Sequence, residues 1–202
     1  MKSQNKNVKV AALIIAAGES NRLGIPKQLI KWKDKTLIEH IINLIKDTNL
    51  SPVIVVLGAY RNEISNVLRN TGISILINNH WQEGKASSIR IGINNLTKDI
   101  DAVIIFVVDQ PYLNKDVIDS IIDTYTRKKS LIIAPQINGI FINPVLFDHA
   151  MFKELKMLNN NEGGLVLFNK YPVEVLPWSD ERLLIDIDRL EDLTKLMEQG
   201  DI

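Results

Sequence analysis

A short apolar run that opens into a basic, glycine-containing loop is the feature that most limits how this chain can fold. The run over residues 8–16 has the length and composition of a buried β-strand. The loop after it carries glycines at Gly18 and Gly24 and cations at Arg22 and Lys27. Glycine lets a backbone approach a ligand closely, and cations together with backbone N–H groups hold phosphate chains. The stretch predicts a strand that ends in a phosphate-binding loop, although an ordinary surface loop with two cations fits the same residues.

Strand and helix patterns alternate along the first two thirds of the chain. Thr36 and Glu39 have the spacing of a capping box, which predicts a helix start. Further strands are predicted over 52–57, 73–77, 102–108 and 131–133, and helices over 37–45, 61–69, 87–96 (opened by Ser87 and Ser88) and after Asn114. This alternation indicates an α/β fold with a mainly parallel, doubly wound sheet. Ligands of such sheets bind beyond the C-terminal ends of the strands.

The last third is less regular. We expect a turn and strand over 139–147, a helix over 151–158, strands over 173–176 and 183–187, and a closing helix over 190–197. No repeat, low-complexity tract or linker interrupts the chain. A single domain over residues 1–202 is therefore expected, which the length allows.

Composition removes several classes of function. The 24 cations balance the 24 anions, whereas a general nucleic-acid binder needs a basic excess. There is no cysteine, which excludes disulfides, thiolate metal sites and cysteine nucleophiles, and the three histidines are scattered. No apolar run reaches the roughly 18 residues of a membrane span, and the first residues are polar rather than signal-like. We expect a cytoplasmic protein without nucleic-acid or membrane partners.

Two acidic positions are candidate metal ligands. Asp109 directly follows the apolar run 102–108 and precedes Gln110 and Pro111, so it is expected at the rim of the sheet, where a carboxylate can hold Mg²⁺ against phosphates. A plain strand-ending turn is the alternative. Asp186 and Asp188 are two residues apart, which points both to one side of a strand. Capping of the last helix is the alternative for one of them.

The loop Ile15-Ala-Ala-Gly-Glu-Ser-Asn-Arg-Leu-Gly-Ile-Pro-Lys27 resembles the L-A-A-G-x-S-x-R-x-G-x-x-K motif of nucleotidyltransferases related to the molybdenum-cofactor guanylyl- and cytidylyltransferases. Only the opening leucine differs. The resemblance implies a Rossmann-like three-layer α/β/α domain. It also implies a loop that wraps the nucleotide triphosphate through Ala16, Ala17, Gly18, Arg22 and Lys27. Alanine at position 17, where the guanylyltransferases have glycine, is similar to the enzymes that use CTP.

Other motifs extend the resemblance. Asp109-Gln-Pro111 is similar to the (A/V)-D-Q-P motif, whose aspartate binds magnesium, and the stretch 186–192 is similar to D-I-D-T-P-E-D, which implies Asp188 as the second ligand. Arg189 and Leu190 replace the usual threonine and proline. Within 83–92, which resembles E-G-M-x-x-S-L-R-x-G, Ser88 is implied to lie by the base and ribose. Asn78 matches an asparagine of the nucleotide pocket.

The acceptor side departs from the family pattern. Asn143 and Pro144 stand where the family has H-P-V-L-F, so they are the implied acceptor-binding residues with asparagine in place of histidine. Asn161 and Leu165 replace the aspartate and arginine of a G-D-x-G-A-R motif, and Lys85 replaces a methionine. Loss of an arginine that can pair with an anion is not a conservative change.

The resemblance implies a Mg²⁺-dependent enzyme that moves CMP from CTP to a phosphorylated acceptor and releases pyrophosphate. The implied acceptor is the molybdopterin cofactor, and the implied partner is a molybdenum hydroxylase. Arg22, Lys27 and Asp109 are the implied catalytic residues. Two alternatives stay open: transfer to a sugar or polyol phosphate, and a non-catalytic protein that binds a cofactor and hands it to a molybdenum hydroxylase.

Overall fold

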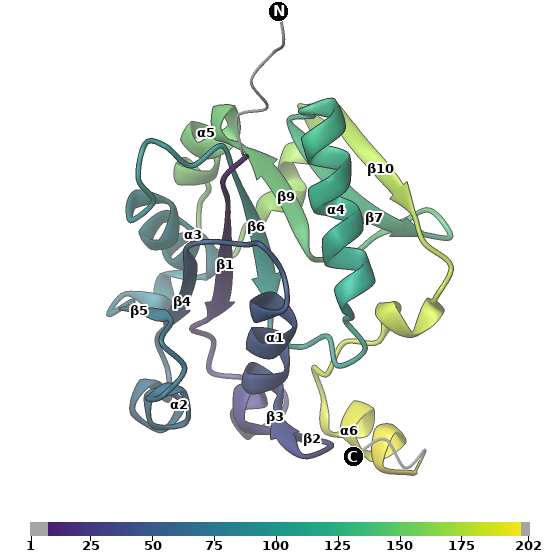
Figure 1. Ribbon diagram of the computed structural model, residues 1–202. Coiled ribbons are helices and arrows are strands. Elements are labelled where there is room, and N and C mark those ends of the chain that lie inside the picture. The colour runs from purple at the N-terminus through teal and green to yellow at the C-terminus, as the bar shows by residue number, and fades with distance from the viewer. Residues whose placement is uncertain (1–7, 199–202) are drawn as a thin grey trace, which may run out of the picture.

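The main feature of the fold is a twisted sheet of eight strands that separates two layers of helices (Figure 1). The computed structural model describes residues 8–198. The strand order is β10-β7-β9-β6-β1-β4-β5, with β8 paired to β7. Only β9 and β8 run antiparallel to their neighbours, and every other pairing is parallel. The predicted mainly parallel mixed sheet is confirmed.

The strands of this sheet are β1 (Val10–Ala16), β4 (Val53–Leu57), β5 (Ser74–Ile77), β6 (Ala102–Val107), β7 (Ile132–Ile137), β8 (Ile140–Phe141), β9 (Val145–Asp148) and β10 (Val173–Pro177). A small hairpin is formed by β2 (Lys31–Trp32) and β3 (Lys35–Thr36). The α-helices are α1 (Leu37–Lys46), α2 (Arg61–Leu68), α3 (Lys85–Asn94), α4 (Lys115–Lys128), α5 (Phe152–Lys156) and α6 (Leu190–Glu198). Among the described residues, no helix is both long and apolar enough to cross a lipid bilayer.

Strand β1 lies at the centre because both of its faces are apolar. Ala12 and Ile14 pack into a core shared with α1 and α4, whereas Ala11 and Leu13 pack into a second core shared with α3 and α5. This period of two is what a strand buried on both sides requires. The predicted three layers are therefore present, with the helices on both faces of the sheet.

The order of the strands creates a switch point beside β1. From β1 the chain moves to β4 and β5 on one side, and then returns to β6 on the other side. Ile15 of β1 is level with Val107 of β6, so the C-terminal ends of the two strands lie next to each other. A crevice at such a reversal is the usual ligand site of an open α/β sheet. The predicted phosphate-binding loop follows the end of β1, and Asp109 follows the end of β6, so both lie at this reversal.

Local signals placed most helix starts correctly. Thr36 caps α1 through the predicted capping box, with Glu39 Oε2 accepting from the Thr36 backbone N–H at 2.8 Å. Asn114 caps α4. Helix α3, however, begins at Lys85 after Gly84, two residues before the predicted serine start. Ser87 and Ser88 are therefore inside the first turn, where both are buried.

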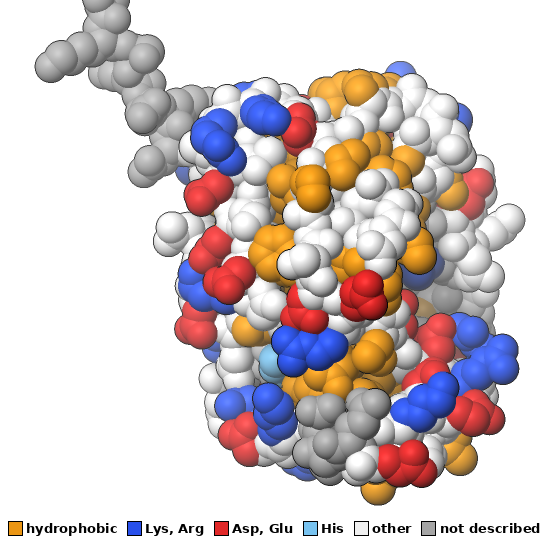
Figure 2. All heavy atoms as spheres, turned by 90° about the vertical axis from the view of Figure 1, so that its right-hand side faces the viewer, with side chains coloured by type: hydrophobic (Ala, Val, Ile, Leu, Met, Phe, Trp, Pro, Cys, Tyr) orange, Lys and Arg blue, Asp and Glu red, His pale blue; other side chains and the backbone are white. Residues whose placement is uncertain are grey.

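The predicted strand over 183–187 is wrong. Residues Glu181–Leu184 form a 3₁₀ helix, and the extended segment after it joins no sheet. The apolar pattern that suggested a strand instead reflects burial of a segment outside the sheet, since Ile187 is completely buried. Its backbone N–H donates to the Asp109 carbonyl at 2.8 Å. The edge of the sheet on this side of the molecule is β10, where apolar side chains form a band between charged ones (Figure 2).

Candidate functional site

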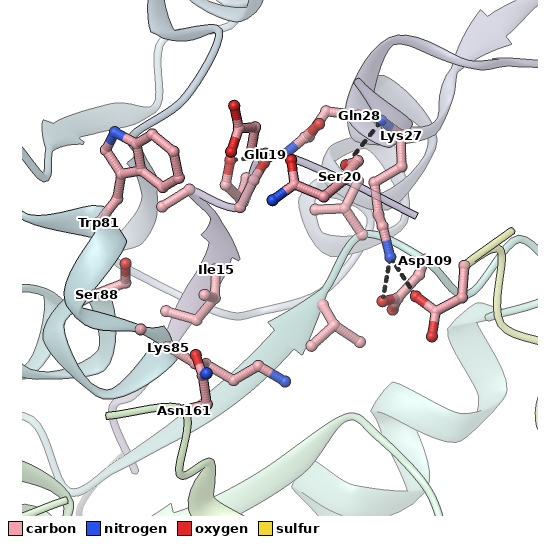
Figure 3. A pocket seen from close by; sticks show the side chains of 18 of the residues that line it. Ile15, Glu19, Ser20, Lys27, Gln28, Trp81, Lys85, Ser88, Asp109 and Asn161 are labelled. Atoms are coloured by element: carbon pink, nitrogen blue, oxygen red, sulfur yellow. Dashed lines mark hydrogen bonds and ion pairs between the residues drawn. The ribbon is translucent and has the colours of Figure 1, made fainter. Parts of the chain in front are cut away.

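A cavity of about 510 Å³ opens at the switch point between β1 and β6 (Figure 3). Its walls come from the loop after β1, the end of β6, the start of α3 and the segment before α6. Nine of the eleven residues predicted for the site line it: Ala16, Ala17, Gly18, Arg22, Lys27, Ser88, Asp109, Asn143 and Asp188. Asn78 and Pro144 do not. Residues that are 172 positions apart in the chain, from Ala16 to Asp188, thus meet in one cavity.

Hydrogen bonds hold the loop after β1 in a fixed shape. The N–H groups of Leu23 and Gly24 both donate to the Ser20 carbonyl, at 2.9 and 3.0 Å, and form a tight turn. Gln28 is buried, and its amide donates to the carbonyls of Ala16 at 2.9 Å and Gly18 at 3.0 Å. The loop therefore does not depend on a ligand for its order. Gln28 was not among the predicted site residues, because its role depends on these hydrogen bonds, which no sequence motif indicates.

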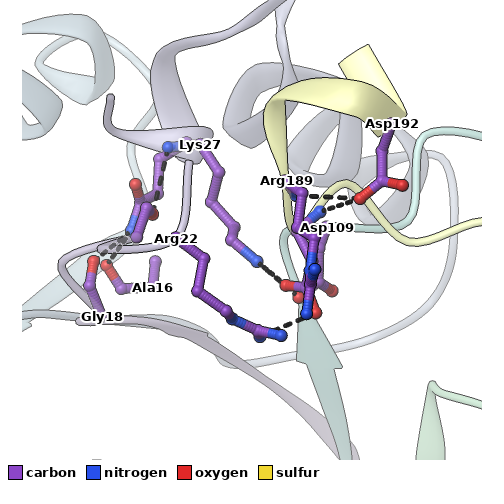
Figure 4. A network of polar contacts seen from close by, with 10 residues as sticks. Ala16, Gly18, Arg22, Lys27, Asp109, Arg189 and Asp192 are labelled. Carbon is purple, nitrogen blue, oxygen red and sulfur yellow. Dashed lines mark hydrogen bonds and ion pairs between the residues drawn. The ribbon is translucent and has the colours of Figure 1, made fainter. Parts of the chain in front are cut away.

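The two cations of the loop are paired with the two predicted metal ligands (Figure 4). Lys27 Nζ lies 3.0 Å from Asp109 Oδ2 and 2.7 Å from Asp188 Oδ1. Arg22 Nη2 lies 2.8 Å from Asp188 Oδ2. The Lys27 side chain is 15% exposed, against 63% for Arg22. Lys27 is therefore the enclosed centre of this network, and Arg22 closes it from the solvent side.

The network changes the ionisation of its members. Burial alone lowers the pKa of Lys27, but Asp109 and Asp188 outweigh burial, and the pKa is raised. Burial alone likewise raises the pKa of Asp188, but Lys27 and then Arg22 outweigh it, and the pKa is lowered. Both shifts favour the charged forms, as expected for opposite charges in contact. The contact between Lys27 and Asp188 thus stabilises the charged form of each.

Asp186 also lines the cavity, as its two-residue spacing from Asp188 predicted, although no strand forms there. The surrounding walls limit hydration of its carboxyl, and Asp109 and Asp188 add negative charge nearby. Together they raise the pKa of Asp186 to about 7, against the opposing charges of Lys27 and Lys85. Asp186 thus differs from Asp188, which is held ionised by its cations.

Asp109 and Asp188 form a donor set that suits a small divalent cation. Their carboxylates converge on one ammonium group, so a positive charge already lies between them. No cluster of three or more acidic, histidine or cysteine side chains suited to a metal occurs among residues 8–198. Mg²⁺ accepts such a site, because it takes one or two carboxylates and completes its shell with water and phosphate oxygens. The residues present therefore fit this ion.

Asp192 fixes the direction of Asp188. Its carboxylate accepts the backbone N–H groups of Asp188 at 3.1 Å and of Arg189 at 2.8 Å, just before α6 (Figure 4). The replacement of threonine and proline at positions 189 and 190 therefore leaves a capped helix start. The predicted capping role in this acidic stretch belongs to Asp192 rather than to Asp186 or Asp188.

Asn78 lies behind the cavity wall. It is fully buried, and its amide donates to Ser87 Oγ at 2.7 Å and to Ser88 Oγ at 2.9 Å, while its carbonyl accepts the His80 N–H. Ser88 itself lines the cavity, next to Trp81 on the same wall (Figure 3). Asn78 thus orients a cavity residue without lining the cavity itself.

Trp81 is held close to the loop by a glycine. A side chain at Gly58 would lie 2.5 Å from Trp81 Cβ and 2.7 Å from the Ala17 carbonyl. Both distances are too short for a real contact, so position 58 needs glycine. The indole therefore forms part of the cavity wall, on the other side from Asp109 (Figure 3).

Comparison with known proteins places this geometry in context. The family described as MobA-like NTP transferase domain matches residues 12–175. Nicotine blue oxidoreductase of Paenarthrobacter nicotinovorans is 23% identical over 93% of this chain and 96% of its own length. A probable molybdenum cofactor guanylyltransferase of Bacillus mycoides is 26% identical over 65% of this chain and 64% of its own length. The match to the bifunctional protein GlmU of Buchnera aphidicola, 30% identical, covers 60% of this chain but only 26% of that protein.

Among solved structures, Rv0371c from Mycobacterium tuberculosis H37Rv has a TM-score of 0.84 at 23% identity, over 95% of this chain and 98% of that one. A second structure of Rv0371c, in complex with manganese, has a TM-score of 0.80 at 20% identity, over 95% and 99% of the two chains. These likenesses agree with the Rossmann-like fold predicted from the sequence.

Proposed function

The chain belongs to the MobA-like NTP transferase domain family and is a nucleotidyltransferase by that membership, and on this premise we propose that it transfers CMP from CTP to a phosphorylated acceptor. Pyrophosphate is the second product. The observation that carries the proposal is the meeting of the loop cations Arg22 and Lys27 with Asp109 and Asp188 in one cavity. Cations for a triphosphate and carboxylates for a divalent cation are the two requirements of such a transfer.

The nucleotide is expected along the wall formed by the loop after β1, Trp81 and Ser88. Arg22 offers a planar fork of donors and Lys27 a compact charge, and both suit phosphate oxygens. The loop is already fixed by Gln28, so little ordering cost opposes binding. CTP is proposed because Ala17 occupies the position where the CTP-using relatives have alanine. A base-by-base comparison of affinity tests this choice.

Asp109 and Asp188 are the residues that would hold Mg²⁺ when the nucleotide binds. A bound Mg²⁺ supplies positive charge that stabilises the charge developing on the phosphate oxygens. For this, Lys27 must leave the two carboxylates, and the triphosphate gives its ammonium a new partner. The manganese complex of Rv0371c is in keeping with a divalent cation in this fold.

The reaction needs positioning rather than a covalent enzyme intermediate. An oxygen of the acceptor phosphate attacks the α-phosphorus of CTP, and a new phosphorus–oxygen bond forms. The bond from the α-phosphorus to its bridging oxygen breaks, and the electron pair leaves with pyrophosphate. Arg22 and Lys27 are placed to neutralise the charge that grows on this leaving group. Trp81 and Ser88 orient the nucleoside end.

We propose the molybdenum-bound pterin cofactor as the acceptor and a molybdenum hydroxylase as the partner that receives the product. The likeness to a molybdenum cofactor guanylyltransferase supports this choice. Asn143 and Asn161, which line the cavity in place of the usual histidine and aspartate, favour a different grip on the acceptor. A sugar or polyol phosphate is therefore the alternative acceptor, and a carrier protein without turnover is the alternative of another class.

Pyrophosphate release from each of the four ribonucleoside triphosphates, with and without Mg²⁺, tests the proposal across three acceptors: the pterin cofactor, a hexose phosphate and methylerythritol phosphate. Release from CTP with the pterin cofactor is the expected result. Release with another acceptor alone replaces the pterin assignment, and binding of CTP without any release favours the carrier protein. Nicotine blue oxidoreductase, which this chain matches over nearly the whole length of both proteins, is named an oxidoreductase. A further assay therefore follows the oxidation of a reduced nicotinamide nucleotide. Activity in this oxidation assay alone contradicts the proposal.

A further inference from the structure

Lys85 is a third cation of the cavity, and no ion pair with its ammonium is formed within the described part of the chain. Arg22 and Lys27 are both bound to carboxylates. The Lys85 ammonium makes no hydrogen bond or ion pair with any residue from 8 to 198, although it lines the same cavity. In Figure 3 its side chain extends into the cavity beside Asn161, toward the side on which Lys27 and Asp109 lie, and no interaction joins it to them.

The Lys85 side chain is directed into the cavity by the backbone around it. Lys85 is the first residue of α3, and the loop 159–164 packs against this helix start. The Ala86 N–H donates to the Asn160 carbonyl at 3.0 Å. Gly84 has a φ of +101°, and a side chain there would lie 2.4 Å from the same carbonyl, so only glycine allows this approach. The Lys85 stem passes Gly163, with its Cδ 3.5 Å from where a Cβ would be.

Two asparagines and Asp186 line the same cavity as Lys85. Asn143 and Asn161 line the cavity and carry amide donors. Asp186 is close enough to interact with Lys85 electrostatically, but the two form no ion pair. An ammonium with two amides can bind a phosphate group, because all three supply donors and the ammonium supplies the charge. The charge of Asp109 and Asp188 is already matched by the other two cations.

We propose that Lys85, together with Asn143 and Asn161, binds the phosphate monoester of the acceptor and so selects phosphorylated acceptors. This inference rests on the proposed function, because it assigns the second substrate of the same cavity. Lys85 comes from the start of α3 and Arg22 and Lys27 come from the loop after β1, and all three line one cavity, in which the α-phosphorus is expected among them. The acceptor oxygen held at Lys85 is the one that forms the new bond, and pyrophosphate leaves toward Arg22 and Lys27.

Phosphate binding to the protein tests the proposal. Phenyl phosphate is titrated into wild-type protein and into Lys85→Met, with and without a non-hydrolysable CTP analogue and Mg²⁺, and binding is followed by calorimetry. Loss of one charge-assisted hydrogen bond weakens binding by about tenfold to a hundredfold, and we expect this loss in Lys85→Met. Lys85→Arg should stay within about threefold of wild type, because the charge and donors remain. Lys98→Met, at an exposed lysine outside the cavity, is the matched control.

Each outcome separates this inference from the proposed function. Equal affinity of Lys85→Met and wild type for phenyl phosphate overturns the role of Lys85. Weaker binding of the CTP analogue to Lys85→Met, with phenyl phosphate unaffected, also overturns it and moves Lys85 to the nucleotide phosphates. Failure of wild-type protein to bind the CTP analogue contradicts the proposed function. The titration without the analogue still compares Lys85→Met with wild type in that case.

Discussion

Replacement of Lys27 by methionine should make the free protein bind a divalent cation more tightly. In the structure the Lys27 ammonium donates to Asp109 at 3.0 Å and to Asp188 at 2.7 Å, in a position that is 15% exposed. A metal that uses both carboxylates must displace this ammonium. Methionine keeps the approximate length and apolar stem of the side chain and removes the competing charge.

The size of the effect follows from the bonds that the metal has to break. A hydrogen bond to a charged group contributes about 1.5–3 kcal/mol. Asp188 is 34% exposed and Arg22 keeps its partner there, so the lower half of that range applies to each bond. Displacement of Lys27 breaks both bonds and then costs about 3–4.5 kcal/mol, and at about 1.4 kcal/mol per factor of ten this is roughly a hundredfold to a thousandfold in metal affinity. CTP should bind more weakly to the same variant, since it loses one phosphate partner.

Electron paramagnetic resonance of free Mn²⁺ measures this change directly, because bound Mn²⁺ loses its sharp signal. Wild-type protein, Lys27→Met and Lys98→Met are titrated without nucleotide, and Asp109→Asn in the Lys27→Met background locates the ion. Opposite changes in Mn²⁺ and CTP affinity are the expected pattern. If Mn²⁺ binds Lys27→Met no more tightly than wild type, the carboxylate pair is not the metal site and the argument from the ammonium position fails.

Three further changes test other parts of the structure. Asp109→Ala should reduce transfer by at least about a thousandfold while the circular dichroism spectrum stays that of wild type, because a metal ligand is lost and no core contact changes; turnover like that of wild type contradicts the metal assignment. Gln28→Leu leaves the carbonyls of Ala16 and Gly18 without their donor and should lower the free energy of unfolding by about 2–4 kcal/mol in urea, with a near-zero change as the refuting result. Hydrogen bonds from Thr36 lower the pKa of Glu39, so this group stabilises the fold above its unfolded pKa and loses that effect as the pH falls through its folded pKa. Glu39→Gln should therefore cost about 0.5–1 kcal/mol at pH 7 and progressively less in acid, and a pH-independent difference argues against the capping box as its cause.

Local patterns in the sequence were sufficient for most of the fold. The apolar run of β1, the capping box of α1 and the cap of α4 each depend on residues within a few positions of one another. The alternation of strands and helices then limits the sheet to mainly parallel pairing. The strand predicted over 183–187 failed because the Ile187 side chain is buried in the apolar core from outside the sheet, and a local pattern does not distinguish that from burial in a strand.

By itself the sequence determined most of the residues that line the cavity, because motifs at strand ends are brought together wherever the strands are parallel and adjacent, but it did not identify Gln28 and it wrongly included Asn78 and Pro144. Only the tertiary structure decided how they interact. The bonds from Lys27 to Asp109 and Asp188 span 82 and 161 positions, and the bond from Arg22 to Asp188 spans 166. The entry of Lys85 into the same cavity depends likewise on the packing of the loop 159–164 against α3. Such pairings depend on which charged groups lie close together in space, and these distances are defined only once the chain has folded.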